Sequence, residues 1–589
     1  MKKILFHYKI LCLAVFLMLT SNLLKAQHNY KSMVSDGPAS AAAMAAKKVR
    51  NSDGVVRYKL VQIAPDILKS RQISIELFDG ETAYFDQFEH QTTSLSDNSW
   101  SGKSAGKKFG NLIITQDYDA IQASVFWGKK LYRIVPLEGE TYLLLEIDNS
   151  NFPNEDCIDL KNGSLFLDKP SDLSKDPGDN PVGCNIRLLV AYTDAANTWA
   201  QNNFFTDALG LAQAAIAATN TSYNNSNVNF QVELAHLVRV GYTETGSFAT
   251  DVDNFQDPSD GNMDEIHALR DLYRADLCVL ITQGNSDCGR AYEIGADADE
   301  AFCAANASCC VGNFSFAHEL GHLYGARHDP YVDGSSTPFS YGHGFVELSE
   351  QWRTVMSYND ECSDAGSSCT RLGFWSNPNV NHPTSGTAMG TTADNHNARV
   401  LNETGSALRG FRVQAVNHIL SNTTLAGITF ADLTAINSII ASNDYFLDPT
   451  ATVQFRAGEF IRLSPGFESR AGSIFRASIE PFDPCPGGRP DIERDNDISF
   501  GTDVAFNLFP NPASDQVHIT YFMSEKTDAS MYIFNSLGRS VMEPELSNTV
   551  NQGLHQVDLD LSGLPDGIYW CLIRFSNGDK LRRAFVIAR

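Results

Sequence analysis

Three histidines and a glutamate stand close together near the middle of the chain, in an order suited to binding a metal ion. The stretch from Phe316 to Asp329 reads FAHELGHLYGARHD and contains the pattern H-E-x-x-H-x-x-G-x-x-H. His318 and His322 are four residues apart, so on a helix they share one face and can bind the same ion. Glu319 lies beside them, where it can polarise a water molecule at the metal without being a ligand.

The glycine in this stretch predicts a third ligand. Gly325 lets the chain leave the helix in a conformation that residues with a Cβ resist, which brings His328 back toward the metal. Three neutral imidazoles and one open position describe a catalytic zinc site, because a structural site would be closed by a fourth protein ligand. The alternative is a helix that holds three histidines by chance, and the extended pattern makes it the weaker interpretation. One catalytic Zn²⁺ is therefore expected, and Ca²⁺ is left open as a second ion.

A second motif lies downstream, in Thr354-Val355-Met356-Ser357-Tyr358. It resembles the Met-turn of the metzincins, zinc peptidases named for a methionine beneath the metal site. The resemblance extends from near Cys184 to near Arg412. The stretch from His318 to Asp329 is closest to the adamalysin (reprolysin) group, whereas Tyr358 resembles the tyrosine of astacins, serralysins and pappalysins.

The resemblance implies a mechanism and a role for each residue. Zinc would activate a water molecule, and Glu319 would accept its proton and pass it to the leaving amine. Met356 would support the histidines from below, while Tyr358 would stabilise the oxyanion, with a core aromatic as the alternative. His343 would be structural or line the rim of the site. Residues Gly289 to Glu293 would lie in or near the edge strand along the cleft, where an extended substrate could add as a further strand.

The same resemblance implies roles for two flanking positions. Asp329 would tie the end of the zinc helix to the chain beyond it. The segment from Leu372 to Pro378 would border the pocket for the residue after the scissile bond, with Phe374 and Trp375 as an apolar wall.

The N-terminal part of the chain is expected to be removed in two steps. Residues 1–26 resemble a secretory signal, with lysines before an apolar run and a small residue at the end. Residues 27–182 hold recurring strand-like stretches and end in an Asp- and Pro-rich segment, 168–181, typical of an exposed linker. This pattern favours a β-rich propeptide, and the alternative is a permanent substrate-binding domain.

Cys157 is the odd cysteine of this propeptide and the candidate zymogen switch. Its thiolate could occupy the open metal position until the propeptide leaves, which resembles the cysteine switch of several metzincin zymogens. Asp156 or Asp159 could do the same with a carboxylate. The structural alternatives are a disulfide with Cys184 or simple burial.

Residues 183–413 are predicted to form the catalytic domain, a twisted α/β sheet followed by the zinc helix. Strand-like and helix-like patterns alternate: strands at 186–192, 230–240 and 277–281, helices at 207–219 and 263–273. The region holds eight cysteines, an even number that favours disulfides in an exported protein. They are Cys184, Cys278, Cys288, Cys303, Cys309, Cys310, Cys362 and Cys369. Cys362 and Cys369 are the natural local pair.

The C-terminal third is predicted to contain two small β units. In residues 414–486, Phe455-Arg456-Ala457-Gly458 is echoed fourteen residues later by Ser469-Arg470-Ala471-Gly472, which indicates a stack of β coils. In residues 502–589, strands alternate with turns and predict an antiparallel β-sandwich. Its words LFPNPA and LPDGIY closely resemble the C-terminal sorting domain of the type IX secretion system. A carbohydrate-binding sandwich is the alternative.

The sequence as a whole predicts a multidomain zinc endopeptidase, made as a zymogen and secreted or held at the cell surface. Its partners would be protein or peptide substrates and the type IX machinery, which would carry it from the periplasm across the outer membrane. A net charge of −25 without a basic tract argues against nucleic acid, and no later segment is long enough to be transmembrane. Two alternatives remain: a surface adhesin or binding protein whose metzincin domain does not cleave, and a zinc amidase acting on non-protein amides.

Overall fold

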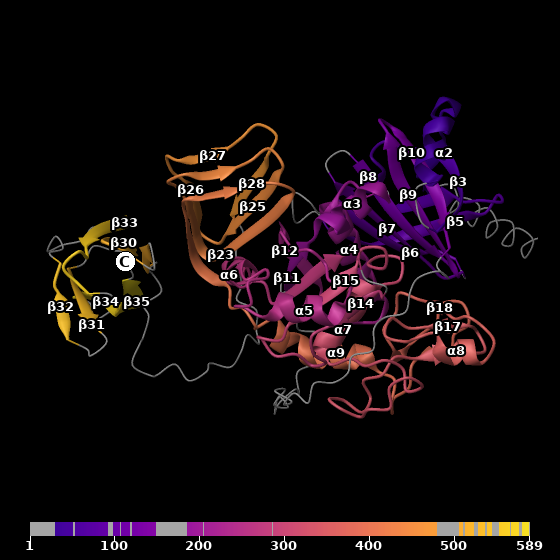
Figure 1. The fold of residues 1–589 in the computed structure, drawn as a ribbon. Helices are drawn as coiled ribbons and strands as arrows, with labels where there is room; N and C mark the ends of the chain where they lie inside the picture. The colour runs from indigo at the N-terminus through magenta and orange to yellow at the C-terminus, as the bar shows by residue number, and fades with distance from the viewer. Residues whose placement is uncertain are drawn as a thin grey trace, which may run out of the picture.

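The computed structural model describes residues 30–148, 185–479 and 506–589, apart from short gaps inside these ranges. The signal sequence, the 168–181 segment, Cys157 and Cys184 lie outside the described residues. No helix in the part of the chain that is described is long and apolar enough to cross a membrane. Figure 1 shows the described parts in order along the chain, from the indigo N-terminal sheet to the yellow C-terminal strands.

The first unit is a sheet in the order β1-β4-β5-β6-β7-β8-β9-β10-β3-β2, with helix α2 (Ala42–Arg50) before β3. The strands are β1 (Lys31–Ser32), β2 (Val34–Asp36), β3 (Val55–Ile63), β4 (Gln72–Glu76), β5 (Thr82–Gln91), β6 (Asn98–Ser104), β7 (Gly110–Asp117), β8 (Ala120–Trp127), β9 (Lys130–Glu138) and β10 (Thr141–Ile147). Successive side chains of a strand point to opposite faces. Leu112 and Ile114 therefore face the core of this sheet, whereas Ile113 between them joins the core of the next unit.

The second unit is built on a mostly parallel sheet. Its order is β14-β15-β13-β11-β12, in which only β14 runs antiparallel to its neighbour. The strands are β11 (Ile186–Tyr192), β12 (Val232–Arg239), β13 (Leu277–Thr282), β14 (Gly289–Ala291) and β15 (Phe302–Asn306). The helices are α3 (Asp194–Asn202), α4 (Ala208–Asn225), α5 (Phe248–Gln256), α6 (Glu265–Tyr273), α7 (Ser315–Tyr324), α8 (Asp360–Asp364) and α9 (Asn397–Leu408). Edge strand β14 contains the first residues of the 289–293 segment.

Helix α4 is longer than predicted because its polar C-terminal residues are satisfied inside the protein. The Thr219 hydroxyl donates to Ala215 O at 2.9 Å, and Asn220 exchanges two hydrogen bonds of 2.9 Å with the backbone of Val232. The helix is buried on nearly every side because it lies between its own sheet and the N-terminal sheet. Polar residues that would end an exposed helix are therefore compatible with a buried one here.

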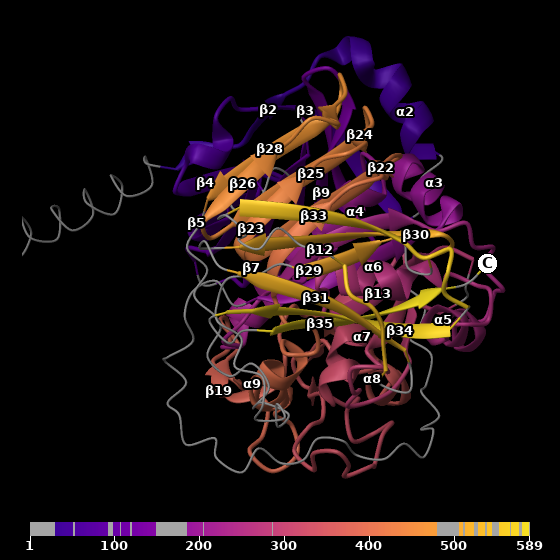
Figure 2. The ribbon, with the colours of Figure 1, turned by 90° about the vertical axis from the view of Figure 1, so that its left-hand side faces the viewer.

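Parallel coils follow the catalytic region. Their strands are β21 (Ala415–Leu420), β22 (Thr423–Leu425), β23 (Thr429–Ala441), β24 (Tyr445–Leu447), β25 (Ala451–Ala457), β26 (Phe460–Leu463), β27 (Phe467–Ser469) and β28 (Ile474–Ile479). Figure 2 shows β23, β25 and β28 side by side. Stacked partners are 22 residues apart, as in Thr429↔Ala451 and Phe455↔Ala477. The fourteen-residue echo in the sequence is therefore not the structural repeat.

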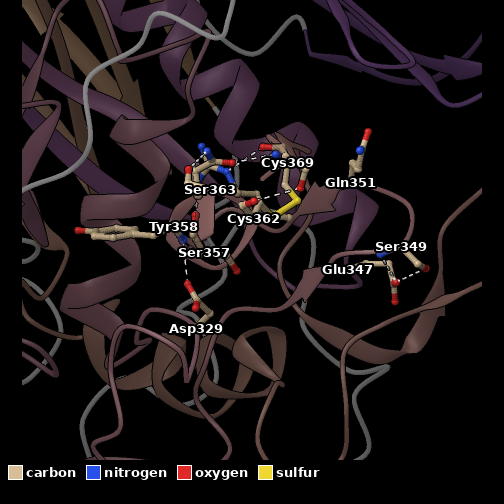
Figure 3. The surroundings of a disulfide bond; sticks show 12 residues. Asp329, Glu347, Ser349, Gln351, Ser357, Tyr358, Cys362, Ser363 and Cys369 are labelled. Atoms are coloured by element: carbon tan, nitrogen blue, oxygen red, sulfur yellow. Dashed lines mark hydrogen bonds between the residues drawn. A yellow bond between two sulfur atoms is a disulfide. The ribbon is translucent and has the colours of Figure 1, made fainter. Parts of the chain in front are cut away.

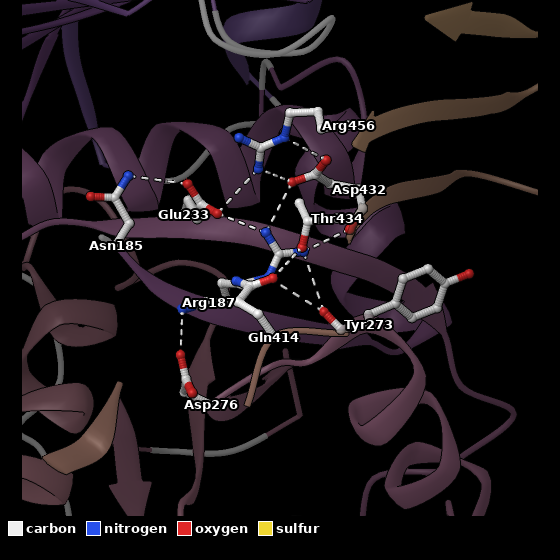
Figure 4. Close-up of polar contacts among 9 residues, drawn as sticks. All are labelled: Asn185, Arg187, Glu233, Tyr273, Asp276, Gln414, Asp432, Thr434 and Arg456. Atoms are coloured by element: carbon white, nitrogen blue, oxygen red, sulfur yellow. Dashed lines mark hydrogen bonds and ion pairs between the residues drawn. The ribbon is translucent and has the colours of Figure 1, made fainter. Parts of the chain in front are cut away.

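The coils continue the catalytic sheet across the boundary predicted at residue 413. Strand β23 pairs antiparallel with β12, with Ala431 opposite His236, so both units share one sheet. A buried charge cluster spans this junction (Figure 4). Arg187 lies 2.7 Å from Glu233 and 3.1 Å from Asp432, and Arg456 from the coils also binds both carboxylates.

The last described unit has two antiparallel sheets, β29-β30-β33 and β32-β31-β34-β35. Its strands are β29 (Phe506–Phe509), β30 (Gln516–Met523), β31 (Ala529–Asn535), β32 (Ser540–Met542), β33 (Gly553–Asp560), β34 (Gly567–Phe575) and β35 (Lys580–Ile587). Their inward side chains, such as Ile519, Ile533 and Phe585, form one core.

Candidate metal centre

The three predicted histidines converge in the interior beside helix α7. His318 and His322 lie on one face of the helix, and all three rings are buried. His328 Nε2 lies 3.2 Å from His318 Nε2 and 3.0 Å from His322 Nε2. Among the described residues this is the one group of three or more His, Cys, Asp or Glu side chains close enough to hold a metal ion.

Gly325 makes this convergence possible. It caps α7 with φ of 99°, the left-handed conformation predicted from the sequence, which is therefore confirmed. The N–H of Ala326 then returns to Gly321 O at 2.9 Å, and the chain turns His328 toward the helix. A side chain at Gly325 would also meet Pro338 and Phe339, so the turn is closely packed.

The remaining ring nitrogens fix which atoms face the centre. His318 Nδ1 lies 2.9 Å from Val355 O, and His322 Nδ1 lies 2.9 Å from Ala326 O. A carbonyl oxygen accepts a hydrogen bond, so each Nδ1 carries the proton and each Nε2 presents a lone pair. In a tetrahedral zinc site with Zn–N distances of 2.0–2.1 Å, two imidazole nitrogens lie about 3.3 Å apart. The observed spacing therefore fits such an ion.

Glu319 packs against edge strand β14 at Gly289, a position that has no side chain. A Cβ on Gly289 would lie 2.6 Å from Glu319 Oε1 and 2.7 Å from its Cγ. Gly289 belongs to β14, so the space that its missing side chain leaves is filled by the glutamate of the H-E-x-x-H pattern. The sequence analysis did not predict the contact between Gly289 and Glu319, because no local sequence pattern joins these two distant residues.

The Met-turn lies under the helix. Met356 Sδ and the Trp375 ring would each meet a Cβ on Gly321 at 2.7 Å, so the methionine packs directly against the helix between His318 and His322. Tyr358 packs its ring on His328, with centroids 4.2 Å apart, and is 5 % exposed.

Comparisons with known proteins agree with this geometry. Residues 184–370 match the model of metallo-peptidase family M12, and residues 507–588 match that of the secretion system C-terminal sorting domain. A peptidyl-Asp metalloendopeptidase of Xanthomonas campestris is 34 % identical over 405 residues, which cover 65 % of this chain and 94 % of the relative. One of Stenotrophomonas maltophilia K279a is 36 % identical over 338 residues, or 57 % of this chain and 78 % of the relative. The chain belongs to this metallopeptidase family.

The matches also bear on export and on the fold. The sorting domain carries this metallopeptidase across the outer membrane by type IX secretion, so that it is secreted or held at the surface. The fold is multidomain and rich in β structure around an M12 catalytic domain. The family implies a metal ion at the histidine triad and protein substrates.

Asp329 connects the chain that follows α7 to the Met-turn of the metallopeptidase. One carboxylate oxygen accepts from the N–H of Tyr358 at 2.8 Å, and the other accepts from the N–H of Tyr331 at 3.2 Å. Burial raises the pKa of Asp329, and the N–H of Tyr358 opposes that rise. Figure 3 shows this contact near the Cys362–Cys369 disulfide.

The disulfide predictions are partly right. The pair Cys362–Cys369 is confirmed, and Cys288 is bonded to Cys309. The even count suggested further bonds, which is wrong for Cys278, Cys303 and Cys310, whose thiols are free. All three are buried, and burial raises the pKa of Cys278 to about 11. They pack as small apolar side chains.

Two other residues have structural positions. His343 places Nδ1 2.8 Å from His328 O and Nε2 2.8 Å from Ser335 O, so its ring supports the backbone at His328. Trp375 was expected to form a pocket wall, which is wrong. It is fully buried, and its indole N–H donates to Ser222 Oγ on α4 at 2.9 Å. Sequence alone could not separate an apolar wall from an apolar core.

Proposed function

We propose that this metallopeptidase is a zinc endopeptidase made as a zymogen, and that it cleaves peptide chains beside aspartyl residues. The observation that carries the proposal is the convergence of His318, His322 and His328 through their Nε2 atoms, with Glu319 alongside. The preference for aspartate is taken from the names of the relatives. The catalytic boundaries proposed are 183–413, preceded by a propeptide at 27–182 and followed by a β-stack at 414–486 and a sorting domain at 502–589.

The chain's own residues divide the work. A zinc ion in this ligand set polarises a carbonyl group and lowers the pKa of water. Glu319 takes the proton from the attacking water and gives it to the leaving amine. Tyr358, beside His328, donates a hydrogen bond from its hydroxyl to the developing oxyanion and keeps its proton. Met356 packs beneath the ligands and touches no reacting atom, so Met356→Leu leaves most activity intact.

Latency is supported by where the N-terminal sheet packs. Phe126 stacks on Phe314, the residue before α7, with ring centroids 4.9 Å apart. Phe109 packs on Phe374, beyond the Met-turn, at 5.2 Å. The propeptide thus contacts both elements that flank the metal ligands. Cys157 stays the candidate switch, with Asp156 or Asp159 as the alternative.

The rival functions are a non-cleaving adhesin and an amidase for non-protein amides. Glu319 fills the space left by the missing side chain of Gly289 in edge strand β14. A binding protein that does not cleave would not require this fit, so the fit favours the peptidase. Strand β14 pairs on one side only among the described strands, so its other edge can bind an extended main chain. That feature favours peptides over small amides.

Gly289→Ala tests the proposed role of Glu319 without changing an ionisable group. The added methyl would displace the Glu319 side chain, and misplacing a catalytic group by about 1 Å costs roughly 100-fold in rate. The kcat for peptide cleavage by the trimmed enzyme is expected to fall by that factor, while bound zinc stays at one ion per chain. Gly241→Ala is the matched control, because a Cβ there meets nothing within 4 Å. Equal rates for the two variants would contradict the proposal.

A further inference from the structure

The disulfide between Cys288 and Cys309 lies beside the metal centre. Cys288 is the residue directly before Gly289, the position in β14 that packs against Glu319. Cys309 belongs to the chain that leads into helix α7, and its carbonyl oxygen accepts from the N–H of Ser315, the first residue of the helix, at 3.3 Å. The disulfide therefore joins the start of the edge strand to the start of the helix that carries the metal-binding motif.

The other end of β14 is attached to α7 by hydrogen bonds. The N–H groups of Gly295 and Ala296, a few residues beyond the strand, donate to His322 O at 2.8 Å and to Leu323 O at 3.0 Å. Both acceptors belong to the last turn of α7. Strand β14 is thus fixed along the helix at two points, and the disulfide is the upstream point.

The backbone direction at Cys288 shows why the upstream point matters. The N–H of Asn306, the last residue of β15, donates to Cys288 O at 2.8 Å, so Cys288 turns its carbonyl group toward β15. Successive residues of a strand alternate in the edge to which they turn their N–H and C=O groups. Gly289 therefore turns these groups toward the opposite edge, where the proposed substrate strand would add. The residue that contacts Glu319 is also one that faces the substrate.

A strand as short as β14 depends on its attachments. It has three residues and pairs on one side only among the described strands, so its own ladder supplies few hydrogen bonds. The disulfide holds the Cα atoms of Cys288 and Cys309 5.5 Å apart, and both side chains are fully buried. Without it, a shift at Cys288 would move Gly289 relative to Glu319 and would move the backbone groups that face the substrate.

We propose that the Cys288–Cys309 disulfide is a positioning element for peptide cleavage. It sets where β14 lies along α7, and it thereby fixes both the placement of Glu319 and the binding of an extended substrate. The disulfide touches no reacting atom and acts through Gly289. The inference rests on the proposed function, because it assigns the disulfide a role in that reaction.

The test compares two peptides that share the same cleaved bond. The long peptide can extend along β14, whereas the short one contains only the residues beside the bond. The ratio of their kcat/KM values does not depend on how much of the enzyme is active, so partial unfolding alone cannot change it. Both cysteines are replaced together, because Cys310 is a free thiol next to Cys309 and could take its place.

The double variant Cys288→Ala with Cys309→Ala is expected to lose roughly 100-fold in kcat/KM for the long peptide, the cost of misplacing a catalytic group by about 1 Å. The ratio of long to short should fall as well, because binding along β14 is lost. Thermal unfolding and zinc content show whether the trimmed variant is folded and holds one ion per chain. If it does not fold, Cys288→Ala with Cys309→Val refills the space of the sulfur atoms and gives the same readout.

Cys362→Ala with Cys369→Ala is the matched control. This disulfide is also buried, but it closes a short loop after the Met-turn, so its removal should keep the wild-type ratio. Gly289→Ala adds a double-mutant cycle. If the disulfide acts through Gly289, this substitution should cost far less without the disulfide than the roughly 100-fold expected with it.

Three results would overturn the inference: an unchanged ratio in folded, zinc-loaded variants, an equal fall in the control, or independent effects of Gly289→Ala and the disulfide. A wild-type enzyme that cleaves neither peptide, nor any denatured protein, overturns the proposed function itself.

Discussion

The catalytic region meets the N-terminal sheet through side chains, whereas it meets the coils β21–β28 through backbone pairing and buried charge. On the N-terminal side, Asn111 and Asn225 exchange amide hydrogen bonds of 3.0 and 3.4 Å, and rings such as Phe126 and Phe314 stack. No strand of β1–β10 pairs with another described unit. On the C-terminal side, β23 extends the catalytic sheet.

This difference indicates which neighbour is built to separate. A side-chain interface can part without breaking a ladder of backbone hydrogen bonds, and each half remains a folded sheet. Parting β23 from β12 would leave unpaired backbone groups and would separate Arg187, which stays beside Glu233, from its buried partner Asp432. We therefore expect the N-terminal sheet to leave the mature enzyme and the coils to stay with it.

The largest effect is expected from Asp432→Ala. Asp432 is buried and holds both Arg187 and Arg456, so its removal leaves two guanidiniums without this partner and costs about 3–5 kcal/mol of unfolding free energy. Burial raises the pKa of Asp432, but the two arginines outweigh it and the net pKa is lowered. This stabilisation is therefore complete above the ordinary aspartate pKa of about 3.9 and is lost as pH falls through the lower folded value.

Denaturant unfolding at neutral pH would measure this cost. Asp448→Ala is the control, since its ion pair with Arg470 lies in the same coils but is partly exposed, and such pairs contribute about 1 kcal/mol or less. Equal losses in the two variants would show that the buried cluster does not hold the junction.

The second prediction compares cuts at the two junctions. After cleavage within 149–184, the N-terminal fragment is expected to elute separately in gel filtration at low protein concentration. After cleavage at a protease site inserted beside Val413, which is 70 % exposed, both pieces should elute together. If the coils separate under conditions in which the N-terminal sheet stays bound, the prediction is contradicted.

The smallest effect is expected from Phe109→Ala in the N-terminal sheet. Phe109 packs on Phe374, and its backbone N–H donates to Thr384 Oγ1 at 3.0 Å. Truncating an interface aromatic costs about 1–3 kcal/mol of binding. Inhibition of the trimmed enzyme by added N-terminal fragment should weaken accordingly, in a titration against a peptide substrate. Phe88→Ala, on the same sheet beneath Lys103, should inhibit like the unaltered fragment.

Local spacing was enough to predict the histidine triad and the left-handed turn at Gly325. Each depends on residues within one helix and its exit, where periodicity and the freedom of glycine act directly. The fit of Gly289 to Glu319 and the pairing of β23 with β12 join distant segments, and no local pattern encodes them. The 22-residue structural repeat was missed because the similarity between residues 455–458 and 469–472, fourteen residues apart, was easier to see in the sequence.

The cysteines show a related limit. The count alone could not tell that Cys278, Cys303 and Cys310 pack as apolar side chains, because pairing depends on which residues the fold brings together. The short loop between Cys362 and Cys369 could be predicted, since so few residues separate them.

The most direct measurement is cleavage of a denatured protein by the chain trimmed within 149–184, with and without a zinc chelator, beside Glu319→Gln. We predict cleavage that the chelator abolishes and that zinc restores. We also predict that Glu319→Gln binds one zinc ion per chain yet loses about 100- to 10,000-fold in kcat, the range for a lost general base. Cleavage that survives the chelator, or a variant as fast as wild type, would contradict the proposed zinc-dependent mechanism.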